Sequence, residues 1–83
     1  MLTMDVAKLS HVQLADAISQ RCSQFGSVRA ITILQPSEKP QLAFALVGMG
    51  SVTEIDRVVE NLGAAKVDSL AVIKIEQKQA FIN

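Results

Sequence analysis

The sequence contains few of the residue types that build disulfides, metal centres and most catalytic sites. Its 83 residues include one cysteine, Cys22, and one histidine, His11. A single cysteine cannot form an internal disulfide, and no group of Cys and His residues has the spacing of a metal site. His11 has no Ser, Cys or carboxylate partner at the spacing that nucleophilic catalysis requires. We therefore expect a protein that is not an enzyme and holds no metal or other cofactor.

Net charge and long apolar runs are also lacking. Eight basic and eight acidic residues cancel, and the pI is ≈ 6.5, so any attraction to a polyanion must come from a local patch. No apolar run approaches the ~20 residues of a membrane-spanning helix. The N-terminal residues carry Asp5 and no basic stretch, so they do not form a signal peptide. The expected location is the reducing cytoplasm.

Apolar residues, by contrast, are abundant. They make up 49% of the chain, with a mean hydropathy of +0.31. A chain this short buries only ~60% of its unfolded surface, so it needs one compact layer rather than several cores. This composition argues against a disordered chain. The sequence contains no internal repeat and no low-complexity segment. We expect a single domain over residues 1–83.

Two segments with helical periodicity separate segments with extended periodicity. Ser10 with Gln13 forms a capping-box pattern for a first helix over 11–24, and Gly26 fits the position just past its end. Ser51 with Glu54 repeats the capping-box pattern for a second helix, which Gly63 ends. Apolar runs predict four strands, over residues 2–9, 28–34, 41–47 and 70–76.

The resulting element order is β-α-β-β-α-β. The segment 35–40 contains two prolines between apolar runs and predicts a hairpin loop. Residues 64–69 are expected to be a connector, and 76–83 a C-terminal tail. This order predicts an α+β fold, a four-stranded antiparallel sheet with both helices on one face and the other face open.

The spacing of the packing residues resembles that of the RNA recognition motif, a ferredoxin-like βαββαβ plait, over nearly the whole chain. In that family the first helix ends in a pattern that Ile18, Cys22, Phe25-Gly26 and Val28 reproduce. The second helix of the family has the spacing shown here by Ile55, Val58-Val59 and Leu62-Gly63.

The resemblance also places the family's two RNA-contacting motifs. Its six-residue motif corresponds to Met4–Leu9 on the first strand, and its eight-residue motif includes Leu42–Val47 on the third. The family's three stacking aromatics fall at Asp5, Leu42 and Phe44. Only Phe44 is aromatic here, and the basic residue and glycine that open the longer motif are replaced by Pro40 and Gln41.

The open face of the expected sheet is the candidate site. It is too apolar for an ordinary solvated surface, which indicates an interaction site. Its expected members are Asp5, Ala7, Thr32, Leu34, Leu42, Phe44, Leu46, Val72 and Lys74. The resemblance implies weak or context-dependent binding of single-stranded RNA, with Phe44 stacking on a base and Leu42 beside it. Arg29, Lys39 and Lys74 would contact phosphates.

Two other functions fit the same residues. The apolar face could contact a protein partner or a second copy of the chain, in which case a dimer would cover Phe44 and Leu46. Regulatory domains that bind small molecules also have this element order, and their pockets form between subunits. Heavy-metal-binding domains of this order are excluded, because they need a Cys-x-x-Cys loop after the first strand.

Overall fold

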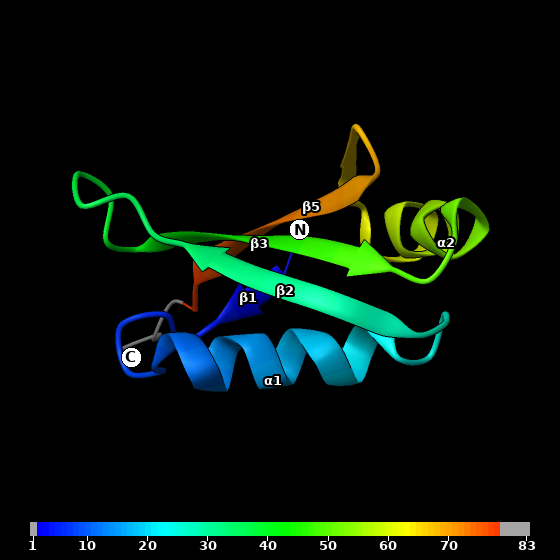
Figure 1. Cartoon of the computed structure of the whole chain (residues 1–83). Coiled ribbons are helices and arrows are strands. Elements are labelled where there is room, and N and C mark those ends of the chain that lie inside the picture. Colours follow the sequence, from blue (N-terminus) through cyan, green and yellow to red (C-terminus); the bar gives the residue numbers. More distant parts are fainter. Residues whose placement is uncertain (1, 79–83) are drawn as a thin grey trace.

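The structure is a computed structural model that describes residues 2–78. Within this range two helices pack against a mixed five-stranded sheet (Figure 1). The helices are α1 (His11–Cys22) and α2 (Val52–Leu62). The strands are β1 (Leu2–Met4), β2 (Val28–Leu34), β3 (Leu42–Met49), β4 (Ala65–Val67) and β5 (Leu70–Gln77). The expected α+β class is confirmed.

Helix α1 begins at the predicted capping box. The Ser10 hydroxyl accepts a hydrogen bond from the Gln13 backbone N–H at 3.1 Å, and the Gln13 side chain accepts one from the Ser10 backbone N–H at 2.8 Å. The helix ends at Cys22, earlier than the predicted residue 24. Ser23 forms the C-cap in a right-handed conformation, and Gly26, with φ of 150°, lies in the following loop. The prediction that Gly26 caps this helix was therefore wrong.

Helix α2 begins with half of the predicted capping box. The Ser51 hydroxyl accepts from the Glu54 backbone N–H. The Glu54 carboxylate instead accepts from the Ser51 hydroxyl at 2.8 Å and from the Ser27 backbone N–H in the loop after α1. Gly63 ends the helix in the left-handed region, with φ of 65°, as predicted.

The sheet does not have the predicted four-stranded antiparallel arrangement. Its order is β1-β5-β3-β2, with β4 paired to β5 as well. The long central pair is β3 with β5, antiparallel from Leu42 opposite Glu76 to Val47 opposite Ala71. Strand β1 pairs with β5 in parallel, so the sheet is mixed. In the predicted plait the first strand would lie beside β3, whereas here β5 occupies that place.

The predicted first strand, residues 2–9, is reduced to β1 because the chain turns at Asp5. The backbone N–H groups of Lys8 and Leu9 both donate to the Asp5 carbonyl, which closes a turn. Val6 is buried in the core from this turn, so its apolar character does not require an extended chain. Asp is common in turns because its short polar side chain can bond to nearby backbone groups. Here the Asp5 carboxylate accepts instead from the Gln77 side chain of β5, which ties the turn to that strand.

The predicted connector, residues 64–69, contains the additional strand β4. It forms a hairpin with β5, in which Val67 lies opposite Leu70. Asp68 occupies the turn with φ of 54°, a conformation that Asp tolerates better than most residues. The predicted last strand, 70–76, extends to Gln77 as β5. Of the expected tail, residues 79–83 lie outside the described range.

The core lies between one face of the sheet and both helices. Alternate residues of β3 and β5 point into it, and Leu14, Ile18 and Cys22 of α1 meet them from the helix side together with Ile55 and Val58 of α2. The core residues from the two strands are Ala43, Ala45, Val47, Ala71, Ile73 and Ile75. The predicted placement of both helices on one face is therefore confirmed, and the opposite face of the sheet is left uncovered by them.

Candidate nucleic-acid interface

The open face of the sheet consists of the residues of β2, β3, β4 and β5 that point away from the helices. Because side chains alternate along a strand, burial of Ala43, Ala45 and Val47 places Leu42, Phe44 and Leu46 on the opposite side. The register across β2, β4 and β5 adds their neighbours. These are Ala30, Thr32, Leu34, Ala65, Val67, Leu70, Val72, Lys74 and Glu76.

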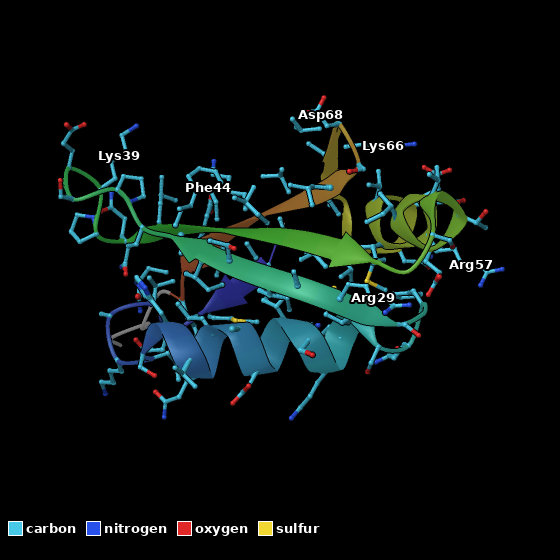
Figure 2. The ribbon with its side chains drawn as sticks, viewed as in Figure 1. Arg29, Lys39, Phe44, Arg57, Lys66 and Asp68 are labelled. Carbon is cyan, nitrogen blue, oxygen red and sulfur yellow. The ribbon has the colours of Figure 1, made fainter. Side chains whose placement is uncertain are left out.

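Phe44 lies at the middle of the open face and is half-buried by its neighbours. In the sheet register it lies opposite Leu34 of β2 on one side and opposite Lys74 of β5 on the other. Figure 2 shows its side chain rising from the face that α1 does not cover. The ring is thus bordered by an apolar side chain and by a cation.

Two lysines lie at the same end of the open face. Lys39 is in the hairpin loop between β2 and β3, where its carbonyl accepts from the Leu42 backbone N–H at 3.0 Å. Lys39, Leu42 and Lys74 line a shallow hollow of about 470 Å³, which is completed by Gln41, Glu76 and Gln77. The Lys74 ammonium lies 3.3 Å from a Glu76 carboxylate oxygen, and both side chains are exposed enough to exchange partners with solvent ions.

Of the predicted site residues, Leu42, Phe44, Lys39 and Lys74 are brought together, and Arg29 is not. Arg29 lies at the far end of β2, near Gly50 and the Glu54 carboxylate (Figure 2). Alternation from Ala30, Thr32 and Leu34 assigns Arg29 to the side of β2 opposite the open face, and the strand also has a register shift between Val28 and Ala30. Arg29 therefore belongs to the junction between the α1–β2 loop and α2, on the other side of the molecule from Lys39.

Asp5 and Ala7 are also absent from the open face, although the sequence predicted them there. Both lie in the turn after β1, where the Ala7 backbone N–H donates to the Gln77 side chain at 2.8 Å. The negative charge that Asp5 was expected to bring to the open face is therefore not there. Glu76 carries a negative charge on that face instead, opposite Leu42 and next to the Lys74 ammonium.

Strand β4 adds apolar surface that the sequence reasoning missed. Val67 is 52% exposed and Leu34 is 49% exposed, so both ends of the open face present large apolar side chains. The signal was present in the sequence as a short alternating run, Ala65-Lys66-Val67, followed by Asp68-Ser69 and another apolar run. That pattern is typical of a two-residue hairpin.

The perturbed titratable groups lie away from this face. Burial raises the pKa of the Cys22 thiol. The hydrogen bond from the Ser51 hydroxyl, the bond from the Ser27 backbone N–H and the charges of Arg29 and Arg57 hold the pKa of Glu54 below its usual range. Within residues 2–78, no group of three acidic, His or Cys residues is placed to hold a metal ion.

No family model, curated protein or solved structure matches this chain. Neither helix of the described range is long and apolar enough to cross a membrane. The open face itself offers one aromatic ring, a continuous apolar surface and two lysines at one end.

Proposed function

We propose that this protein binds short single-stranded RNA on the open face, weakly and through few contacts. The observation that carries the proposal is the position of Phe44, half-buried between Leu34 and Lys74. Lys74 also lines the neighbouring hollow together with Lys39 and Leu42. A base can stack on an aromatic ring whatever its identity, because every base has a π-face. In this proposal Lys39 and Lys74, which line one hollow at the end of the open face, contact the phosphates that flank the stacked base.

The number of contacts sets the expected strength. Stacking on one aromatic contributes about 1–3 kcal/mol per base, and a dissociation constant of 1 mM corresponds to about 4.1 kcal/mol. One ring and two lysines, one of which also faces Glu76, therefore support affinities in the millimolar to high-micromolar range. Tight binding would need further contacts, such as those of a neighbouring domain or of a second copy.

Titration with a short oligouridine, followed by amide chemical shifts, tests the proposal. We expect the shifts to centre on Leu42, Phe44 and Lys74. Phe44→Ala should weaken binding roughly 5- to 150-fold, the equivalent of one lost stack. An absence of shifts on the open face at millimolar RNA, or unchanged binding by Phe44→Ala, would overturn the proposal.

Salt dependence separates the lysine contacts from the stack. For single strands each phosphate contact contributes a slope of about −0.7 in the plot of log K against log salt, so two contacts give about −1.4. Lys74→Gln should halve that slope, whereas Arg21→Gln, an exposed change on α1, is the matched control and should leave it unchanged.

A second candidate is contact of the open face with protein, and the apolar character of that face favours it. Exposed Leu34 and Val67 lie at its two ends, with Leu42, Leu46 and Val72 between them. Phe44→Leu distinguishes the two functions, because it removes the π-face and keeps most of the apolar area. Loss of RNA binding in Phe44→Leu supports stacking. Concentration-dependent amide shifts over Leu42 and Leu46 without RNA, retained in Phe44→Leu, would support self-contact through the face.

A further inference from the structure

Strand β2 has a free edge along the length of the sheet. Within residues 2–78 it pairs with β3 on one side and with no strand on the other. Figure 1 shows β2 at the border of the sheet, with α1 beneath it. An edge strand presents unpaired N–H and C=O groups, which form a template for pairing with another strand.

The middle of this edge carries none of the features that usually prevent such pairing. Natural edges are protected by charged residues, prolines or bulges, and the run Ala30-Ile31-Thr32-Ile33-Leu34 contains no charge and no proline. The protections lie at its ends, where the register shift and Arg29 precede the run and Pro36 follows it. They confine any pairing to the segment from Ala30 to Leu34.

We propose that two copies of this chain pair through these edges, antiparallel and about a two-fold axis at Thr32. In this register Ala30 lies opposite Leu34 of the other copy, Ile31 lies opposite Ile33, and Thr32 lies opposite itself. Directly opposed residues of an antiparallel pair share a face. On the open face the small Ala30 side chain would therefore lie beside the large Leu34 side chain of the other copy, and on the helix side Ile31 would lie beside Ile33. A Thr–Thr pair is among the favourable cross-strand pairs.

This register uses the whole free run and brings no like charges together. The next pair outward sets Arg29 against Gln35 of the other copy, and then Val28 against Pro36, which ends the pairing because proline has no N–H. Self-complementarity of this kind is what a two-fold interface requires, since the same residues must serve on both sides. It is why we assign the edge to a second copy rather than to an unrelated peptide.

Helix α1 supplies apolar surface that a second copy would cover. Val12 is 70% exposed, and it lines a hollow of about 310 Å³ along the edge with Ala15, Ile31 and Ile33. The rest of the lining is His11 and Thr32. A pair of strands alone is marginally stable in water and needs a hydrophobic layer, which Val12 and the isoleucines of both copies would provide.

The pairing would join two sheets and place both open faces on the same side, because the two-fold axis is perpendicular to the sheet. The Leu34 residues would lie at the joint, with one Phe44 on each side. This inference does not depend on RNA binding, since the edge and the hollow beside α1 are distinct from the ring of Phe44.

Sedimentation velocity over a concentration series, without RNA, tests the pairing. We expect a dimer of twice the 8.9 kDa chain mass. Thr32→Lys should convert it to a monomer, because it sets two like charges directly opposite each other, and Thr32→Glu should do the same. An equimolar mixture of the two variants should restore a dimer that contains one of each.

The matched control is Thr3→Lys, a change of an exposed threonine in β1 at the opposite border of the sheet, which should leave the dimer intact. Leu42→Lys should also leave it intact, because Leu42 lies on β3 away from the β2 edge. A monomer at every concentration, or Thr32 variants that do not re-pair in the mixture, would overturn the inference. So would a dimer that Leu42→Lys dissociates, which would point to contact through the open face.

Discussion

At the scale of single residues, Glu54 connects two parts of the chain that are distant in sequence. Its carboxylate accepts from the Ser27 backbone N–H in the loop after α1 and from the Ser51 hydroxyl at the start of α2. A Cβ on Gly26 would collide with this carboxylate, and the φ of 150° at Gly26 is strained for residues other than glycine. The close approach of loop and helix therefore depends on both residues.

Glu54 gives the protein a pH-dependent stability of definite sign. The bonds from Ser51 and Ser27 lower the pKa of Glu54 in the folded state. A lowered pKa contributes stability that is present above the ordinary carboxyl range near about 4.3, and this stability is lost as the pH falls through the folded value. We expect thermal melts from pH 7 to pH 3 to show a smaller loss of stability in Glu54→Gln than in the wild type. Equal losses would contradict this role, and Asp16→Asn on the exposed face of α1 is the control.

The residues of the candidate site were predictable where local alternation decides their position. Phe44 and Leu42 share a face because β3 is regular, and Lys74 follows from the alternation of β5. Arg29 was predicted to contact phosphates, yet the alternation that puts Thr32 and Leu34 on the open face assigns residue 29 to the opposite side of β2. A bulge between Val28 and Ala30 also lies there. No pattern of residue types in that segment marks the bulge.

At the scale of elements, the start of α1 depends on the reciprocal bonds between Ser10 and Gln13. Ser10→Ala leaves the Gln13 backbone N–H without its side-chain acceptor, and loss of an N-cap typically costs about 1 kcal/mol. We expect the melting temperature to fall by roughly 4–8 °C for a domain of this size. Ser37→Ala, in the exposed hairpin loop, should change it little. An equal effect of the two substitutions would show that the cap contributes nothing measurable.

The elements that were predicted correctly are those that local physics specifies. Capping residues and 3.6-residue spacing fix where both helices begin, and the prolines at 36 and 40 mark the hairpin loop. The first strand was extended too far because Met4 and Val6 alternate with polar residues, yet Val6 reaches the core from a turn. Alternation over so few residues does not distinguish a strand from a turn that buries one side chain.

At the scale of the whole molecule, the order of the strands was the part the sequence could not specify. An apolar run shows that a segment is buried, but it does not show which strand lies beside it. Here the hydrogen bonds that place β1 come from the other end of the chain, where the Lys78 backbone N–H donates to the Met4 carbonyl at 2.8 Å. The Gln77 side chain bonds to Ala7 and Asp5 nearby. These contacts hold β1 against β5, at the border of the sheet rather than its centre.

A pair of engineered cysteines distinguishes this order from the four-stranded plait. Leu46 and Val72 lie directly opposite each other on β3 and β5, and opposed Cα atoms of an antiparallel pair are about 4.5–5.5 Å apart. That distance is within the range of a disulfide, so oxidation of Leu46→Cys/Val72→Cys should give an intramolecular bridge, stabilising by about 2–4 kcal/mol. The native Cys22 is buried and should not compete.

The control pair is Thr32→Cys/Val72→Cys, oxidised at low protein concentration. Thr32 lies opposite Leu46 on β2, and Val72 lies opposite Leu46 on β5. Two strand spacings, about 9.6 Å, therefore separate Thr32 from Val72, which is too far for a disulfide within one chain. In a plait with the first strand between β3 and the last strand, Leu46 and Val72 would be separated by that same distance. Failure of the Leu46–Val72 pair to bridge in the folded protein would therefore exclude the β3–β5 pairing, and its rapid bridging would exclude the plait.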